Sequence, residues 1–301
     1  MDQFSISQLA QFSGVKAHTI RIWEQRYKAL NPKRSEGNTR YYDGEQLRRL
    51  LNIVSLSGTG KKVSSLCVMK DEELYRLVEE YAAEAVQQTD FQYFVNQLIS
   101  AGMAYDELNF HKIFSHCQVR FGLHDTYTKV IYPLLDRIGL MWLSNSIPPS
   151  QEHYISNLLC QKIFTAIDAL ALPKEDREHE SWVLFLPENE FHEIGLLYSN
   201  YVLRSNGQKV IYLGPNVPLA SVKGTLVDTG ASNLLLFLVH KDAPENLEQY
   251  LGELQELQEG THIWIAGNSS LKEEAVKNDS INWLFSTDDL GERLGKLTVN
   301  I

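Results

Sequence analysis

The segment GVKAHTIRIWEQRY (Gly14–Tyr27) decides the architecture of the first part of the chain. Gly14 ends a preceding helix, which the capping-box pattern Ser5–Gln8 begins. A second helix is predicted from Val15 to Tyr27, with Ile20 and Trp23 on its apolar face. Two short helices joined at a glycine are typical of a helix-turn-helix, whose second helix enters the major groove of DNA.

A basic, turn-rich and aromatic hairpin follows from Asn31 to Tyr42, of the kind called a wing, and Asp43 is expected to cap a third helix. Side chains near the start of the second helix can reach base edges, and the surrounding cations are placed to meet phosphates. The predicted DNA contacts are Lys16, His18, Thr19 and Arg21 for bases, Arg26, Lys33, Arg34 and Arg40 for phosphates, and Tyr27 and Tyr41 for sugar or phosphate.

The charge of the chain is unevenly distributed. The 301 residues carry a formal net charge of −10, which alone argues against a nucleic-acid partner. Residues 1–63, however, hold 11 basic and 5 acidic side chains, a net charge of +6, and the remainder has a net charge of −16. A basic head before an acidic body indicates that double-stranded DNA meets the head alone.

Two further domains are predicted after the head, which is assigned to residues 1–70. Residues 71–175 carry four amphipathic helical stripes and predict a four-helix bundle. In residues 176–301 five apolar strands alternate with helices, which is typical of a flavodoxin-like (Rossmann-type) doubly wound parallel sheet. The predicted strands are Trp182–Leu186, Val210–Leu213, Asn233–Val239, His262–Ala266 and Ile281–Phe285, and a short helix is expected at Leu271–Val276.

A candidate ligand site follows the first of these strands, where open α/β sheets bind ligands. The segment contains Glu190, His192 and Gly195 in the pattern Glu-x-His-x-x-Gly. A neutral imidazole can be an axial metal ligand when a carboxylate accepts from its other ring nitrogen. Gly195 would let a bulky cofactor lie close to the backbone. An exposed loop histidine without a ligand is the alternative.

The chain resembles known families in each of its parts. Residues Ile6–Arg40 resemble the DNA-binding domain of MerR-type regulators, and residues 181–301 resemble cobalamin-binding domains, in which the pattern at Glu190–Gly195 supplies an axial histidine. In MerR-type regulators with such domains, the CarH/LitR-like light-sensing repressors, the helical cap carries Trp, nine residues and then Glu-His; here these are Trp142, Glu152 and His153.

This resemblance implies a transcriptional regulator, not an enzyme, that senses cobalamin, in the adenosyl form by analogy. His192 would ligate the cobalt below the corrin, and Trp142, Glu152 and His153 would cover its upper face. Cofactor binding would change self-association, as a dimer or tetramer, and DNA affinity together.

The sequence also departs from the cobalamin-binding pattern. Such domains often have Ser-x-Leu or Ser-x-Thr at the end of the third strand, where the nucleotide tail is buried, and this chain has Phe237-Leu-Val239. The usual Gly-Gly after the fourth strand is Ala266-Gly267, and Leu143 stands where light-sensing members can carry a second histidine. The segment Leu213–Pro218 fits the pattern of the second loop. A cofactor-free regulator and a corrinoid methyl-transfer module therefore remain as alternatives.

The remaining features of the sequence concern the cellular compartment and the presence of other known motifs. Three widely spaced cysteines predict reduced thiols in a cytoplasmic protein, and the longest apolar run, Leu234–Val239, is too short to span a membrane. The chain lacks a signal-peptide pattern and the P-loop, nucleophile-elbow and kinase motifs. One short stretch contains four residues of types that can bind zinc: His111, His116, Cys117 and His124. Zinc binding is not favoured there, because their spacing does not place them on one face of a helix.

Overall fold

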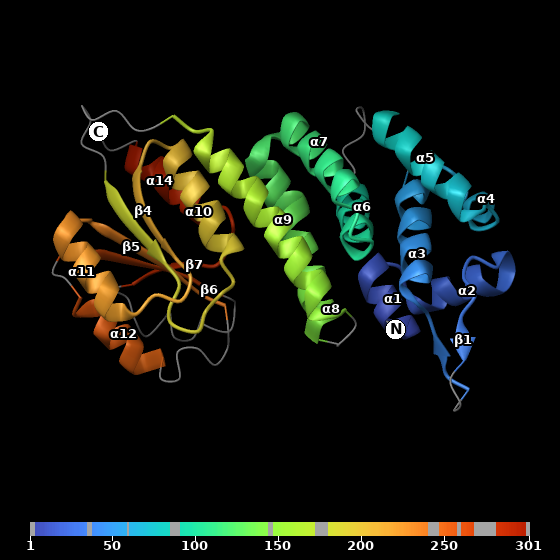
Figure 1. The fold of residues 1–301 in the computed structure, drawn as a ribbon, viewed down its shortest axis with the longest axis horizontal. Coiled ribbons are helices and arrows are strands. Elements are labelled where there is room, and N and C mark those ends of the chain that lie inside the picture. Colours follow the sequence, from blue (N-terminus) through green and yellow to red (C-terminus); the bar gives the residue numbers. More distant parts are fainter. Residues whose placement is uncertain are drawn as a thin grey trace. The chain divides into compact units, whose positions relative to one another are not determined.

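The computed structural model describes residues 4–34, 38–58, 60–84, 91–143, 147–171, 180–239, 247–257, 260–267 and 281–298. The chain forms two compact units, Met1–Asn157 and Leu158–Ile301 (Figure 1). The predicted division into three domains is a finer one, and it remains a prediction.

The first unit begins with the predicted helix-turn-helix. Helix α1 (Ile6–Ser13) starts with a complete capping box, in which the Ser5 N–H donates to Gln8 Oε1 at 2.7 Å. Gly14 has φ +72°, a left-handed conformation that favours glycine, and ends the helix. Helix α2 (Ala17–Tyr27) starts two residues later than Val15, the predicted start, because Lys16 has a non-helical ψ of 137° and is the N-cap.

The wing and a third helix follow. Strands β1 (Lys33–Arg34) and β2 (Arg40–Tyr41) pair antiparallel, and residues 35–37 at the tip of the wing lie outside the described residues. Asp43 caps α3 (Gly44–Ser57) as predicted, since its Oδ1 accepts from the Gln46 N–H at 3.1 Å. The short helix α4 (Val63–Cys67) completes the head.

The rest of the first unit is helical. Its elements are α5 (Asp71–Glu84), α6 (Phe91–Met103), α7 (Glu107–Thr126), a π-helical turn (Tyr127–Ile131), α8 (Tyr132–Leu143) and the start of α9 (Pro149–Asp168). The prediction of four helical segments was incomplete, because α7 is a separate helix. Its buried Phe110, Phe114 and Cys117 do recur at helical spacing, but Gly122 interrupts the helix at φ +74°.

The second unit contains the predicted parallel sheet. The strands are β3 (Ser181–Phe185), β4 (Lys209–Gly214), β5 (Asn233–Leu238), β6 (His262–Gly267) and β7 (Asn282–Leu284). Their order is β4-β3-β5-β6-β7 and all neighbouring pairs are parallel. This is the flavodoxin-like order, so the fold prediction is confirmed.

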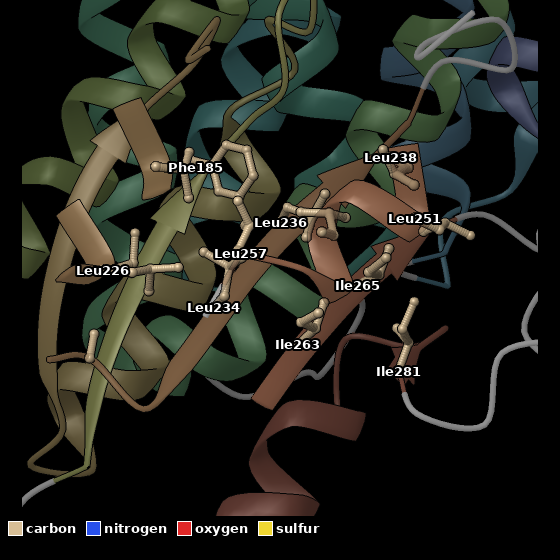
Figure 2. Close-up of a cluster of buried hydrophobic side chains, with 14 of the residues drawn as sticks. Phe185, Leu226, Leu234, Leu236, Leu238, Leu251, Leu257, Ile263, Ile265 and Ile281 are labelled. Carbon is tan, nitrogen blue, oxygen red and sulfur yellow. The ribbon is translucent and has the colours of Figure 1, made fainter. Parts of the chain in front are cut away.

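Helices cover both faces of this sheet (Figure 1). On one face α11 (Leu219–Thr229) and α12 (Leu247–Gln255) pack on a fully apolar cluster that includes Leu234, Leu236 and Leu238 of β5 (Figure 2). Helices α10 (Ile194–Ser205) and α14 (Asp289–Thr298) cover the other face. The short helix predicted at residues 271–276 lies outside the described residues.

Candidate DNA-binding surface and candidate cofactor site

The predicted DNA contacts in the head lie at or near its surface. Lys16, His18 and Arg21, at the start of α2, are exposed, and so are Arg26, Lys33 and Arg34. Thr19, Tyr27, Arg40 and Tyr41 are half-buried. Buried Ile20 anchors α2 in the head, as predicted, and this leaves the polar side chains at the helix start facing outward.

Glu24 is a residue of this surface that the sequence analysis missed. Its two carboxylate oxygens accept from Arg40 Nε at 3.0 Å and from the Tyr42 hydroxyl at 2.7 Å. Burial and the neighbouring Glu24 carboxylate raise the pKa of Tyr42 above its usual range, so the hydroxyl keeps its proton. Glu24 thus fixes the wing strand β2 against α2, and the lone acid of that helix was the available signal.

Within the first unit the head is bonded to the helices that follow it. The Arg137 guanidinium of α8 donates to the Phe12 carbonyl at 3.1 Å and to Asn96 Oδ1 at 2.6 Å, and also to Gln92 Oε1. Gln97 of α6 donates to Ser55 Oγ of α3 at 3.1 Å. Arg137, a side chain of the helices that follow the head, therefore holds the end of α1, the helix before α2.

The candidate cofactor site lies at the carboxyl edge of the parallel sheet, in the loop between β3 and α10. Glu190 is only 1% exposed, and its Oε1 accepts from the backbone N–H groups of Phe191 and His192 at 2.9 and 3.0 Å. The same oxygen lies 2.6 Å from His192 Nδ1. The His192 side chain is 56% exposed. A buried carboxylate thus orients an exposed imidazole through Nδ1, an arrangement in which coordination of a metal would use Nε2.

The second strand–helix loop supports this arrangement. The Asn216 N–H donates to the Glu190 carbonyl at 3.2 Å, and the Asn216 side chain accepts from the Asn189 N–H at 3.0 Å. Asn189 and Asn216 both have positive φ, at 66° and 58°, a conformation that asparagine tolerates. The loop after β4, which includes the segment Leu213–Pro218, therefore holds the histidine loop in place.

Other residues beside His192 were not predicted. Phe191 is 63% exposed and offers a flat apolar surface next to the imidazole. Glu193 accepts from the Tyr212 hydroxyl at 3.2 Å and lies 3.9 Å from Cys160 Sγ. Burial and the Glu193 carboxylate raise the pKa of Tyr212 above its usual range. In the sequence, the available signals were the aromatic Phe191 directly before His192 and the acidic Glu193 directly after it.

Gly195 is covered by a side chain of the chain itself. A Cβ built on Gly195 would lie 2.6 Å from Cε1 and 3.0 Å from Cδ1 of Phe237. These distances are too short for non-bonded carbon atoms, so the Phe237 ring occupies the space that the glycine leaves. The close approach that Gly195 permits is thus made by Phe237 in this structure, and the approach of a cofactor to Gly195 remains a prediction.

The other predicted cofactor residues belong to the first unit. Trp142 is 47% exposed. His153 Nδ1 lies 3.0 Å from Glu152 Oε2, and the other oxygen of Glu152 accepts from Ser156 Oγ at 2.7 Å. On α9, His153 is therefore exposed and lies beside the half-buried Glu152.

No group of three or more His, Cys, Asp or Glu side chains in the described parts of the chain could hold a metal ion. Likewise, none of the helices in those residues combines the length and the apolar character needed to cross a membrane.

Comparison with known proteins supports the assignment of the head. Residues 4–66 match the MerR HTH family of regulatory proteins. Over 97% of its length the chain is 25% identical to the HTH-type transcriptional repressor CarH of Myxococcus xanthus, of which it covers 97%. The HTH-type transcriptional repressor CarA of the same organism is 28% identical over 82% of this chain and 80% of its own length.

Two solved structures align with much of the chain. The monomethylamine corrinoid protein of Methanosarcina barkeri matches 75% of this chain and 98% of its own, with 13% identity and a TM-score of 0.48. A cobalamin-binding protein from Desulfitobacterium hafniense matches 73% and 97%, with 15% identity and a TM-score of 0.34.

The winged helix-turn-helix and the family match define a DNA-binding transcriptional regulator. Its head matches the MerR HTH family over residues 4–66, and the similarity to CarH covers 97% of the chain and so extends through both units.

Proposed function

We propose that this chain is a cobalamin-sensing transcriptional regulator, in which a corrinoid bound at the carboxyl edge of the sheet changes the affinity of the head for DNA. One observation carries the proposal: the buried Glu190 carboxylate accepts three hydrogen bonds, one of them from the exposed imidazole of His192. A surface histidine without a ligand has no need of so buried and so organised a carboxylate, because burying a charge is costly. The sequence similarity to CarH along the whole chain supports the same function.

The residues present fit an axial cobalt ligand. Bound cobalamin supplies a cobalt ion that takes a neutral imidazole nitrogen as its lower ligand. Glu190 would fix the tautomer of His192 and make Nε2 the coordinating atom. Phe191 would lie beside the corrin, and Trp142, Glu152 and His153 would close its upper face.

Cofactor binding would act on DNA through association of copies of the chain. A MerR-type head reads a two-fold symmetric site as a dimer, so any ligand that favours one assembly also changes the affinity for DNA. The head contacts DNA through the residues at the start of α2 and in the wing, and the acidic remainder of the chain is kept away from the phosphates. This is regulation by binding, with no catalysed reaction.

The test is a binding experiment with a matched histidine control. Purified full-length chain is incubated with adenosylcobalamin or hydroxocobalamin in the dark and applied to gel filtration. Corrin absorbance should co-elute with the protein, and His192→Ala should weaken binding at least tenfold. His262→Ala is the control, because His262 is also exposed but lies at the amino end of β6, at the opposite edge of the sheet. No co-eluting corrin at micromolar cofactor would exclude the sensor function and leave the DNA-binding function intact.

A second function is favoured by the contact between Phe237 and Gly195. A sheet domain whose ligand space is filled by its own side chain can serve as a protein-interaction module without a cofactor. In that case DNA binding would be the same with and without cobalamin, and His192→Ala would leave it unchanged.

A further inference from the structure

A cobalamin bound through His192 would need space below the corrin for more than the histidine that ligates cobalt. In free cobalamin the base of the cofactor's own nucleotide can occupy the lower position on cobalt. If His192 takes that position, the displaced base and its linker must find room on the same side of the corrin. With the corrin held by His192 at the carboxyl edge of the sheet, that side would face the first turn of α10 and the carboxyl ends of the neighbouring strands.

Phe237 occupies this region. Leu236 and Leu238 of β5 point into the apolar cluster on the α11 and α12 side of the sheet (Figure 2). Because side chains alternate along a strand, Phe237 points to the opposite face, toward α10. There its ring lies within 2.6 Å of the Cβ position of Gly195, three residues after His192.

A second bulky substitution lies next to Phe237. Ala266 of β6 is paired in register with Phe237 of β5, so both side chains are on the α10 face of the sheet. Ala266 is buried, and it adds a methyl group where a glycine would leave open space. Two neighbouring strands thus both add volume on the face that a displaced nucleotide would have to enter.

We propose that Phe237, with Ala266 beside it, is a specificity-determining residue that makes the site select corrinoids without a nucleotide tail over complete cobalamin. The inference rests on the proposed function, and it concerns the class of corrinoid that the site accepts. A cobinamide, which has the corrin and the cobalt but no nucleotide, needs His192 and leaves the Phe237 ring in place. Complete cobalamin would have to displace the half-buried Phe237 ring from its contact with Gly195, which is costly because the ring loses those packing contacts.

The experiment compares two corrinoids on the full-length chain. Dissociation constants for aquocobalamin and for aquocyanocobinamide are measured from the change in their visible absorbance, for wild type, Phe237→Ala and Phe237→Ser. We expect the wild type to bind the cobinamide at least tenfold more tightly than the cobalamin, and both variants to reduce that preference at least tenfold. Phe285→Ala is the control, because Phe285 also follows a strand end but packs on the opposite apolar cluster; it should keep the wild-type ratio.

Each outcome decides the question. Equal binding of both corrinoids by the wild type, or an unchanged ratio in both Phe237 variants, would overturn this inference and leave the cobalamin-sensing function standing. Binding of cobalamin by Phe237→Ser, with neither corrinoid bound by the wild type, would overturn the expected selection of cobinamide and make the natural chain the cofactor-free regulator. If no form of the chain binds either corrinoid, the proposed function and this inference both fail. The wild-type comparison needs no variant, so poor folding of a substituted chain cannot hide the result.

Discussion

Replacement of Arg137 by methionine should loosen the attachment of the DNA-binding head to its helical support. The methionine keeps the apolar part of the side chain and removes the guanidinium, which donates to the Phe12 carbonyl and to Asn96 Oδ1. Asn96 is 2% exposed, so its oxygen would lose a charged donor inside the protein. A hydrogen bond to a charged group contributes about 1.5–3 kcal/mol, and an unsatisfied buried acceptor costs about 1–3 kcal/mol. We expect a loss of about 3 kcal/mol in the free energy of unfolding of the first unit.

Urea unfolding followed by circular dichroism measures this loss, and hydrogen exchange of the α1 amides localises it. A change of about 3 kcal/mol corresponds to roughly a hundredfold faster exchange by opening. Lys129→Met is the control, because its ion pair with Asp125 at 2.8 Å is an exposed i,i+4 pair, and its loss should cost at most about 0.5 kcal/mol. Adding Asn96→Leu to Arg137→Met should recover more than about 1 kcal/mol, since both polar partners are then absent. A cost below about 1 kcal/mol for Arg137→Met would show that water replaces the guanidinium without penalty, and would refute this role.

Three further perturbations test the head and the helical packing. Arg21→Ala should lose about 1–3 kcal/mol on a specific DNA site and little on other sequences, whereas Arg40→Ala should weaken binding to all sequences and flatten its salt dependence; fluorescence anisotropy at several salt concentrations separates the two, and an equal loss on every sequence would contradict base reading by Arg21. Asp43→Ala should cost about 1 kcal/mol as a lost N-cap. Burial opposes the ionisation of Asp43, but the Gln46 N–H and Lys33 outweigh burial and lower the pKa of Asp43. The ionised cap therefore contributes to stability at neutral pH, and this contribution is lost below about pH 4. Asp43→Asn should show less of this acid dependence in unfolding titrations. Gly102→Ala should destabilise the bundle by about 1–2 kcal/mol in thermal or urea unfolding, because the new Cβ would lie 2.4 Å from Cγ1 of Ile155, and the same change in an Ile155→Ala background should be neutral or stabilising.

The positions of the strands and their parallel arrangement could be predicted from the sequence, because each buried strand is a short apolar run and each crossover carries a helical period. The ends of the helices were harder to predict. Lys16 is a good helix former, yet it caps α2 in an extended conformation, because the glycine turn before it sets the direction of the chain. Helix α7 was missed as a separate element, since the polar residues around Phe110 and Phe114 obscure its apolar stripe.

The candidate site was only partly predictable, for a physical reason. Glu190 and His192 are two residues apart, so local geometry alone brings them together, and the sequence pattern identified them. Tyr212 and Cys160 reach Glu193 from 19 and 33 residues away, and only the fold decides that meeting. Glu24 likewise reaches Arg40 of the wing. The structure therefore shows that Arg40, a predicted phosphate contact, forms an ion pair within the head.

Two departures from the cobalamin-binding pattern, Phe237 and Ala266, also come together only in the folded chain. In the sequence Phe237 and Ala266 are separate substitutions, 29 positions apart, and each could be neutral. The parallel register of β5 and β6 places them side by side, and the missing side chain of Gly195 receives the Phe237 ring. The buried Glu190 nevertheless binds Nδ1 of the exposed His192 as well as two backbone N–H groups, so the histidine that would ligate cobalt and its carboxylate partner are in place beside the filled space. The retained ligand pair and the filled space together therefore favour a site with altered selectivity over a site that has been abandoned.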